Sequence, residues 1–268
     1  MTAKELILTH ILKCSRADLY IHGFHLNDKQ QEIYEKITQR IKEGEPLQYV
    51  LGECEFMGHT LRVDPRALIP RPETELLVEI VVEGLLGSNF SKMPQLGLEV
   101  GVGSGNITIA LLKALPELRM IGVDVSMEAL DLCRENVESN GIANRVNLIH
   151  ADVFNWLKED YSGAPKFSFM VSNPPYVKRG DLGSLPADVK REPVLALDGG
   201  EDGLNFYSFI ISHVGRVLKS GGWIFFEIGD DQGKSLDNLL TAQGSFVNIA
   251  IIKDYNQKDR FVKAQLIL

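Results

Sequence analysis

The sequence has little cysteine, no long apolar run and no excess of basic residues. Its three cysteines, Cys14, Cys54 and Cys133, are far apart and form no Cys-x-x-Cys pair, which argues against a disulfide framework and a zinc site and is typical of a reducing compartment. No stretch approaches the roughly 18 apolar residues of a membrane span, and the first residues do not have the layout of a signal peptide. We therefore expect a cytoplasmic protein with no membrane partner and no bound metal.

The charge balance is acidic, since 36 Asp and Glu residues oppose 28 Lys and Arg residues and give a net charge of −8 at pH 7. A protein that binds the nucleic-acid backbone usually presents a basic face, so we expect no direct nucleic-acid partner. Apolar residues make up 44% of the chain, which is enough for a globular core. The length of 268 residues fits one large domain or two unequal ones, and we expect a monomer.

The first 45 residues predict a small helical domain. Asn27 is a suitable N-cap for a helix in which Ile33, Ile37 and Ile41 recur at helical spacing and form one apolar stripe. We expect this stripe to be the core of the domain.

Residues 46–70 predict a β-hairpin and a linker. Two short strands, Gln48–Phe56 and His59–Val63, flank Met57-Gly58, which is a hairpin signal. The proline-rich and charged segment that follows resists regular structure until Glu73, where a helix can begin.

Strands and helices alternate from Gly97 onward, within a domain that we place at residues 71–268. Short apolar strands joined by helices predict right-handed crossovers and a parallel sheet that helices cover on both faces. The last two strands are about eight residues apart, too few for a crossover helix, so we expect them to pair antiparallel. The fold class is therefore α/β, with a seven-stranded, mostly parallel, doubly wound sheet of the Rossmann-like kind. The expected strands are Leu98–Val100, Met120–Val123, Val146–His150, Phe167–Val171, Trp223–Ile228, Val247–Ile252 and Phe261–Ile267, and the expected helices are 104–114, 126–139, 203–218 and 232–241.

A glycine-rich turn follows the first of these strands and is a candidate cofactor site. It reads Gly101-Val102-Gly103-Ser104-Gly105, and such a turn between a strand and a helix lets a ligand approach the backbone closely. The dinucleotide fingerprint Gly-x-Gly-x-x-Gly would need a glycine at Asn106 and is not matched. Glu99, two positions before the turn, would repel a diphosphate and attract a cation. S-adenosylmethionine fits this site because it carries a sulfonium and an ammonium group and no phosphate.

Two aspartates follow the next strands of the predicted sheet. Asp124 lies about 20 residues past the glycine turn, where a carboxylate can accept both hydroxyls of a ribose. Asp152 and Val153 follow the third strand, and Asp152 is placed to meet the adenine amino group. Each aspartate taken alone could instead cap a helix, and for Asp152 that alternative stays open.

The fourth strand runs into Asn173-Pro174-Pro175-Tyr176, the most informative tetrapeptide in the chain. Two consecutive prolines cannot continue a strand ladder, so the backbone is stiff and the Asn173 side chain and the Pro174 carbonyl can point the same way. Two oxygen acceptors so placed suit a planar –NH₂ group with two N–H donors. The Tyr176 ring offers a surface on which a planar amide or base stacks. The alternative is a loop end with a buried tyrosine.

This arrangement predicts N-methylation of a conjugated amino group. An amide nitrogen is a poor nucleophile because its lone pair is delocalised. Holding both N–H groups orients that lone pair toward the sulfonium methyl for in-line displacement. No strong general base is needed, because the methylated nitrogen becomes acidic and loses its proton to solvent.

The order of these motifs resembles the class I S-adenosylmethionine-dependent methyltransferases that methylate amino groups. More closely, the chain resembles the bacterial glutamine-N5 methyltransferases that modify peptide chain release factors. The narrower resemblance is carried by three further segments, which are Ile69-Pro70-Arg71-Pro72-Glu73-Thr74-Glu75, then Glu192-Pro193 with Ala196-Leu197-Asp198-Gly199-Gly200 and Asp202-Gly203-Leu204, and finally Glu227-Ile228-Gly229 with Gln232-Gly233.

The resemblance implies a function and a set of functional residues. It implies methyl transfer from S-adenosylmethionine to the side-chain amide nitrogen, N5, of the glutamine in the Gly-Gly-Gln motif of class I release factors. The helical domain would recognise the release factor. Arg71 and Pro72 would border the cofactor pocket, and Val153 stands where some relatives carry an aromatic residue. Asn173, Pro174, Pro175 and Tyr176 would hold the target amide, and the cofactor would lie against Glu99, Gly101, Val102, Gly103, Ser104, Gly105, Asp124, Asp152, Val153 and Asn173.

Two other functions stay open from the sequence. An adenine-N6 methyltransferase of DNA or RNA would use the same tetrapeptide on a flipped base, but it should carry a basic groove. A nucleotide-binding module without catalysis would have no need of the Asn173 motif. The stretch Lys178–Glu201 has no clear periodicity, and we expect it to form a lid or a substrate groove, or else a mobile surface loop.

Overall fold

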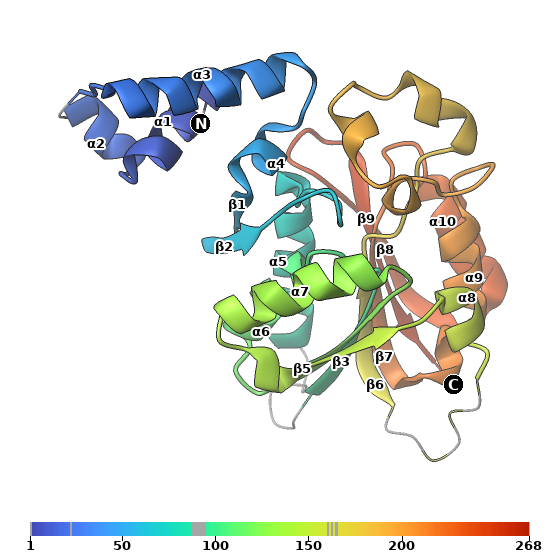
Figure 1. The fold of residues 1–268 in the computed structure, drawn as a ribbon. Coiled ribbons are helices and arrows are strands. Elements are labelled where there is room, and N and C mark those ends of the chain that lie inside the picture. The colour runs from blue at the N-terminus through green and yellow to red at the C-terminus, as the bar shows by residue number, and fades with distance from the viewer. Residues whose placement is uncertain are drawn as a thin grey trace.

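A seven-stranded sheet crosses the centre of the molecule (Figure 1). The computed structural model describes residues 2–21, 23–86, 95–159, 161, 163 and 166–267. The strand order is β5-β4-β3-β6-β7-β9-β8, in which neighbours up to β7 are parallel and β9 is antiparallel to β7 and β8. The predicted fold class and the antiparallel pairing of the last two strands are therefore confirmed. The strands are β3 (Gln95–Val100), β4 (Leu118–Asp124), β5 (Val146–His150), β6 (Phe167–Ser172), β7 (Leu218–Glu227), β8 (Phe246–Lys253) and β9 (Asp259–Leu266).

Helices cover both faces of the sheet because the central strands are apolar on both sides. In β6 every residue is buried, and the side chains alternate, so Phe169 and Val171 join one core while Met170 joins the other. Removing a buried phenylalanine ring typically costs about 3–5 kcal/mol, so the sheet is a stable base for the residues at its strand ends. The first core contains residues of α5 (Pro72–Leu86), α6 (Asn106–Ala114) and α7 (Met127–Ser139), and the second contains residues of α8 (Val153–Trp156), α9 (Asn205–His213) and α10 (Gly233–Gln243).

Most predicted helices of this domain lie within two or three residues of the observed bounds. The start of α7 is fixed by Ser126, whose hydroxyl accepts from the N–H of Ala129 at 3.1 Å. The predicted helix 203–218 is too long at its end, because α9 stops at His213. A 3-10 turn then leads into β7, which begins at Leu218 and not at Trp223 as predicted, since the buried Leu218 already pairs with β6.

Four helices lie in the described part of residues 2–52, three of them within the predicted domain of residues 1–45, and Figure 1 shows these three at one end of the molecule, away from the sheet. The predicted cap of the third is present, since Oδ1 of Asn27 accepts from the N–H of Gln30 at 2.9 Å. Ile37 is buried, whereas Ile33 is 39% exposed. The whole stripe is therefore not core, because a unit this small buries only a narrow face of each helix. The helices are α1 (Ala3–Leu12), α2 (Arg16–Ile21), α3 (Asp28–Lys42) and α4 (Leu47–Leu51).

The hairpin is shorter than predicted, because residues 47–51 form α4 and not a strand. Tyr49 is buried on this helix, and its hydroxyl donates to the carbonyl of Ala67 at 2.6 Å. Gly52 ends the helix with a φ of 76°, which glycine adopts without strain. The tertiary contact of Tyr49 thus overrides the β propensity of the segment. The hairpin strands are β1 (Glu53–Phe56) and β2 (His59–Arg62).

Short 3-10 helices occupy several connections. Three of them lie within Lys178–Glu201, in agreement with the absence of a strand or helix period there. No helix in the described part of the chain is long and apolar enough to span a bilayer. The 3-10 helices are η2 (Ala143–Arg145), η3 (Arg179–Ser184), η4 (Val189–Arg191), η5 (Val194–Ala196) and η6 (Val214–Arg216).

Candidate active site

A cavity of about 330 Å³ opens at the carboxyl ends of β3, β4 and β6. This edge of an open α/β sheet is where ligands bind. Linker residues 66–71 and residues of the segment 193–196 also line the cavity. The sequence-predicted residues that line it are Glu99, Gly101, Val102, Gly103, Ser104, Asp124, Asp152, Val153, Asn173, Pro174 and Pro175, with Arg71 at its border as expected.

Gly105 and Tyr176 do not line this cavity, and neither does Pro72, which was expected at its border beside Arg71. A Cβ at Gly105 would lie 2.7 Å from Sγ of Cys133 on α7, and its φ is 84°, so a glycine is needed for packing beneath the turn. Tyr176 is partly buried against the second core, and burial raises the pKa of its phenol to about 12. The expected stacking surface at Tyr176 thus stays a prediction.

Asp124 ties the end of β4 to the glycine turn. Its carboxylate accepts from the N–H of Gly103 at 2.9 Å and from the N–H of Ser126 at 2.9 Å. Burial raises the pKa of this carboxyl, and the backbone hydrogen bonds oppose that shift. A carboxylate has about four acceptor positions, so Asp124 keeps acceptor capacity toward the cavity that it lines.

Glu99 is the most deeply buried acidic group of the site. Its side chain is 1% exposed and accepts from the hydroxyl of Thr108 at 2.5 Å. Burial raises the pKa of this carboxyl to about 8, so at pH 7 it is largely protonated unless a cation lies beside it. The sequence predicts a negative charge at Glu99. Because the carboxyl is buried, it carries that charge at pH 7 only when a cationic ligand lies beside it.

The residues after β5 form the start of α8 and one side of the cavity. Asp152 caps this helix, since its Oδ1 accepts from the N–H of Phe154 at 2.9 Å. The helix-cap alternative is therefore observed for Asp152, although the residue also lines the cavity. Phe154 and Phe206 line the cavity too, with ring centroids 5.0 Å apart. Sequence reasoning missed this aromatic wall, because it considered only Val153 at the position next to Phe154.

The tetrapeptide turn lies beside the glycine turn because β6 is joined to β3. The hydroxyl of Ser172 donates to the carbonyl of Val100 at 2.7 Å, and both residues are buried at the strand ends. Asn173, Pro174 and Pro175 follow directly and line the cavity. The turn after the fourth predicted strand therefore faces the glycine turn, as the proposed chemistry requires.

Two of the segments that carry the family resemblance contact the chain at Tyr176 and Val177, where it leaves this turn. Nε2 of Gln232 donates to the carbonyls of Tyr176 and Gly203, at 3.2 and 3.1 Å. A Cβ at Gly203 would lie 2.4 Å from the carbonyl oxygen of Tyr176, so only glycine permits this approach. Val177 forms an isolated bridge with Asp198. These contacts keep the chain after Pro175 in place.

A buried polar chain lies behind Asn173 and was not expected from the sequence. The hydroxyl of Thr74 on α5 donates to Oε2 of Glu227 at 2.6 Å, and Nδ2 of Asn173 lies 3.4 Å from the same hydroxyl oxygen. Thr74 and Glu227 are each 1% exposed, and burial raises the pKa of the Glu227 carboxyl to about 7.

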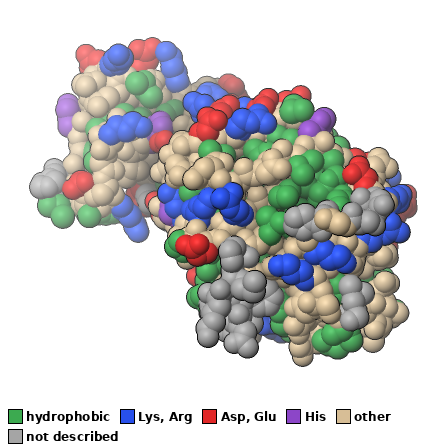
Figure 2. Space-filling view, turned by 90° about the horizontal axis from the view of Figure 1, so that it is seen from below, with side chains coloured by type: hydrophobic (Ala, Val, Ile, Leu, Met, Phe, Trp, Pro, Cys, Tyr) green, Lys and Arg blue, Asp and Glu red, His purple; other side chains and the backbone are tan. Residues whose placement is uncertain are grey.

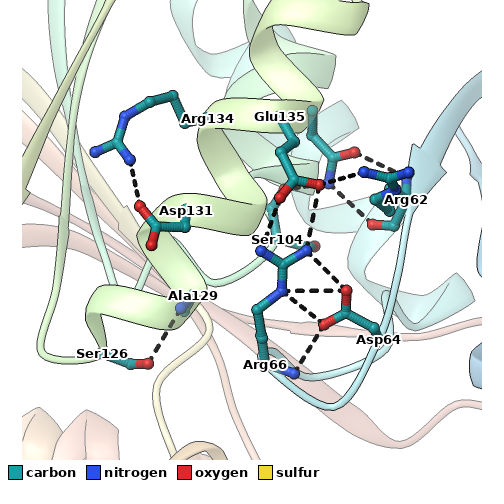
Figure 3. A network of polar contacts seen from close by, with 10 residues as sticks. Arg62, Asp64, Arg66, Ser104, Ser126, Ala129, Asp131, Arg134 and Glu135 are labelled. Atoms are coloured by element: carbon teal, nitrogen blue, oxygen red, sulfur yellow. Dashed lines mark hydrogen bonds and ion pairs between the residues drawn. The ribbon is translucent and has the colours of Figure 1, made fainter.

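Ion pairs join the segment after the hairpin to α7, as Figure 3 shows. Arg66, which lines the cavity, pairs with Asp64 and with Glu135 on α7, each at 2.8 Å. Arg62 pairs with Glu135 at 2.6 Å. Arg66 and Arg62 hold the pKa of Glu135 at about 2. The residues that follow the hairpin are thus attached to α7.

In the part of the chain that the structure describes, no three His, Cys, Asp or Glu side chains are grouped so as to hold a metal ion. The three cysteines are free, and Cys133 is buried.

Comparison with known protein families gives two matches along the chain. The model of the PrmC N-terminal domain matches residues 2–52, and the model of the methyltransferase small domain matches residues 79–185. The second match contains the glycine turn, both aspartates and the tetrapeptide. Solved structures with this fold include a ribosomal protein L11 methylase from Lactobacillus delbrueckii subsp. bulgaricus, with a TM-score of 0.50 and 18% identity over 77% of this chain and 83% of that one. The catalytic domain of hMettl16 in complex with MAT2A 3'UTR hairpin 1 has a TM-score of 0.61 at 16% identity, over 92% and 85% of the two chains. These likenesses concern the fold alone.

Curated relatives are similar over nearly the whole chain. A release factor glutamine methyltransferase from Thermodesulfovibrio yellowstonii is 37% identical over 97% of this chain and 90% of its own length. Proteins of the same name from Chlorobaculum tepidum and Aquifex aeolicus are 38% and 37% identical, over 96% and 97% of this chain and 87% and 89% of their own lengths. The resemblance drawn from the motifs is confirmed, and the chain belongs to the release factor glutamine methyltransferase family, whose methyl donor is S-adenosylmethionine.

Proposed function

We propose that the protein transfers a methyl group from S-adenosylmethionine to the side-chain amide nitrogen, N5, of the glutamine in the Gly-Gly-Gln motif of class I peptide chain release factors. The observation that carries this proposal is that Asn173 and Pro174 line the same cavity as the glycine turn and Asp124. A methyl donor at the glycine turn and an amide at Asn173 would therefore meet inside one cavity.

The residues around the glycine turn suit S-adenosylmethionine, which supplies an electrophilic methyl group when bound. Ser104 lines the cavity and is 1% exposed, and its hydroxyl has no hydrogen-bond partner among the described residues. Such a buried polar atom is satisfied when a ligand supplies the missing partner. Asp124 has acceptor capacity for ribose hydroxyls, and Phe154 and Phe206 offer an apolar wall for adenine. Glu99 becomes a negative charge when a cation is beside it.

The chain's own contribution to the chemical step is orientation. The carboxamide oxygen of Asn173 and the carbonyl of Pro174 accept the two N–H groups of the target amide, which turns its lone pair toward the methyl donor. Orientation of this kind contributes about 7–11 kcal/mol in favourable cases. The positive charge that develops on the amide nitrogen makes its proton acidic, and the proton leaves to solvent without a dedicated base.

The N-terminal helical unit, residues 1–45, would bind the release factor. Several of its apolar side chains remain on the surface. Tyr20 and Ile21 are 70% and 71% exposed, and Phe24 is 48% exposed. Apolar side chains left exposed in this way are typical of protein-binding surfaces. We propose that the protein acts on release factors as a monomer in the cytoplasm.

An adenine-N6 methyltransferase is the alternative that shares the tetrapeptide. Such an enzyme needs a basic groove along the nucleic-acid backbone. The net charge is −8. Figure 2 shows the face at the amino ends of the parallel strands, which is not the face of the cavity, and there Lys and Arg side chains are interspersed with acidic and apolar ones. These observations favour a protein substrate.

Mass spectrometry of a release factor incubated with this protein and S-adenosylmethionine tests the proposal. We expect the mass of one added methyl group on the peptide that contains the Gly-Gly-Gln motif, located on the glutamine side chain by fragmentation. A release factor in which that glutamine is replaced by asparagine should remain unmodified, because its shorter side chain does not reach Asn173.

Duplex DNA and single-stranded RNA serve as competing substrates in the same assay. Methyl transfer to adenine in either one, with the release factor left unmodified, would overturn the proposal in favour of the alternative. Cofactor binding without transfer to any of the three would indicate a binding module.

A further inference from the structure

Three residues from separate segments meet behind the tetrapeptide turn. Thr74 belongs to α5, Glu227 ends β7, and Asn173 follows β6, so the sequence separations are 99 positions for Asn173 and Thr74 and 153 for Thr74 and Glu227. Thr74 and Glu227 are buried, and Thr74 also lines the cavity. The only group among the three that belongs to the proposed amide-binding turn is Asn173.

The hydrogen-bond donors in this chain determine which way the Asn173 carboxamide points. An ionised carboxylate can only accept, and a threonine hydroxyl has one proton to give. The Thr74 proton is used in the 2.6 Å bond to Glu227, so the Thr74 oxygen can only accept from Asn173. The Asn173 atom that lies 3.4 Å from that oxygen must then be Nδ2, the nitrogen of the –NH₂ group. Oδ1 therefore points in the other direction.

We propose that Thr74 and Glu227 are positioning residues, which hold the –NH₂ of Asn173 inward so that its Oδ1 accepts from the target amide. The proposal rests on the proposed function, because the reversed carboxamide would present two N–H donors to the N–H donors of the glutamine. Donor facing donor gives no hydrogen bond, so the amide would keep only its bond to the Pro174 carbonyl and would lose the second bond that orients it. The orientation of one side chain would therefore decide whether the substrate is bound in a reactive pose.

The charge state of Glu227 determines the pH at which the proposal has to be tested. Its pKa is raised to about 7 by burial. Hydrogen bonds from the Thr74 and Asn173 side chains and the charge of Arg260 of β9 oppose the shift, and Glu73 of α5 adds to it. The phenols of Tyr176 and Tyr207 also face this carboxylate. Assays at about pH 8 keep Glu227 largely ionised, so that it can only accept.

Thr74→Val and Thr74→Ser form the matched pair that tests the proposal. Valine keeps the shape of threonine and lacks the hydroxyl, whereas serine keeps the hydroxyl. With a release factor as substrate, we expect Thr74→Val to lower kcat by about tenfold or more, because one orienting hydrogen bond is lost. Thr74→Ser should stay within about threefold of the wild type in kcat. Cofactor affinity, measured by calorimetry, should change by less than about threefold in both variants.

The two variants separate positioning from a general structural role. A Thr74→Val protein that turns over like the wild type overturns the proposal, and so does a Thr74→Ser protein that is as slow as Thr74→Val. An equal loss of cofactor affinity and kcat in Thr74→Val would also overturn it, because the damage would not be confined to the amide. If Thr74→Val does not fold, Thr74→Ala replaces it, since alanine and serine differ by the hydroxyl alone.

The same experiment distinguishes a failure of this proposal from a failure of the proposed function. A wild-type protein that does not methylate the release factor contradicts the function whatever the variants do. A wild-type protein that does so, with Thr74→Val equally active, contradicts only the role of Thr74 and Glu227.

Discussion

Arg71 and Glu192 lie 121 positions apart in the chain and form an ion pair, with 2.6 Å between Nη2 and Oε1. The Glu192 side chain is 2% exposed and the Arg71 side chain 30%. The second oxygen of Glu192 accepts from the N–H of Ile69 at 3.0 Å. The linker before the catalytic domain and the segment after the tetrapeptide are therefore joined at one carboxylate. Both segments line the cavity, so this carboxylate holds the cavity's outer wall together.

Replacing Glu192 with alanine should loosen that wall and weaken cofactor binding. Both hydrogen bonds are lost, and a buried N–H at Ile69 is left without its partner, at a cost of about 1–3 kcal/mol. We expect the dissociation constant for S-adenosylmethionine, measured by calorimetry, to rise about tenfold or more. Glu192→Gln, which keeps one acceptor oxygen, should lie between the alanine variant and the wild type. An unchanged constant in Glu192→Ala would show that the wall does not contribute to cofactor binding.

Asn136 on α7 connects the hairpin to the glycine turn. It is fully buried, with Oδ1 accepting from the N–H of Arg62 at 2.7 Å, and Nδ2 donating to the carbonyls of Arg62 and Ser104 at 3.0 and 2.9 Å. Asn136→Ala should lower the free energy of unfolding by about 1–3 kcal/mol, because the buried carbonyl of Ser104 and two part-buried backbone groups of Arg62 lose their partner together. Denaturant unfolding measures this. Asn140→Ala, one turn further along at a more exposed position, is the control and should cost less than about 1 kcal/mol.

The alternation of strands and helices could be predicted from the sequence because the catalytic domain follows local rules. Strand Val146–His150 was predicted at its observed bounds, since β-branched and apolar residues follow a helix end there. The glycine turn, Asp124 and Asn173 were predicted together for a similar reason. Parallel strands end at one edge of the sheet, so residues that directly follow such strands share a site without any knowledge of side-chain contacts.

The residues that were missed are those whose role depends on contacts across the chain. Thr74 lies on α5 and Glu227 at the end of β7, and nothing local to either indicates that they meet behind Asn173. Phe206, on α9, lines the cavity beside Phe154 in the same way. The helix at residues 47–51 was mistaken for a strand because the tertiary contact between Tyr49 and Ala67 outweighs local propensity.

Asn173→Ala should separate the chemical step from cofactor binding. In the proposed function Asn173 supplies one acceptor for the target amide, and the loss of one such hydrogen bond in a transition state often costs about 2.7–4 kcal/mol, or roughly 10²–10³ in rate. Single-turnover methylation of a release factor measures the chemical step, and calorimetry measures cofactor affinity. We expect the first to fall by that factor and the second to change little, because Asp124 and the glycine turn are untouched. Near-normal turnover would remove Asn173 from the mechanism.

Binding of the cofactor should release a proton from Glu99. Burial raises the pKa of this carboxyl to about 8, so the protein without a cation beside it holds the proton at pH 7. A bound sulfonium favours the ionised form and lowers that pKa. Affinity should therefore rise with pH up to about 8 and level off above it. Calorimetric titration in buffers of different ionisation enthalpy measures the protons released.

Glu99→Gln is the control that assigns the proton, because burial also raises the pKa of Asp124 and of Glu227. Glutamine can still accept from Thr108 but cannot ionise, so proton release should drop and affinity at about pH 8 should fall roughly tenfold.

Ionisation of Glu99 should also lower the free energy of unfolding of the unliganded protein. Its pKa in the folded state lies above the unfolded value of 4.5, so the unliganded wild type should lose stability relative to Glu99→Gln as pH rises from about 4.5 to about 8. Equal proton release by the variant and the wild type would assign the proton to another carboxyl, and Glu99 would then be a buried neutral group without a part in attracting the cofactor.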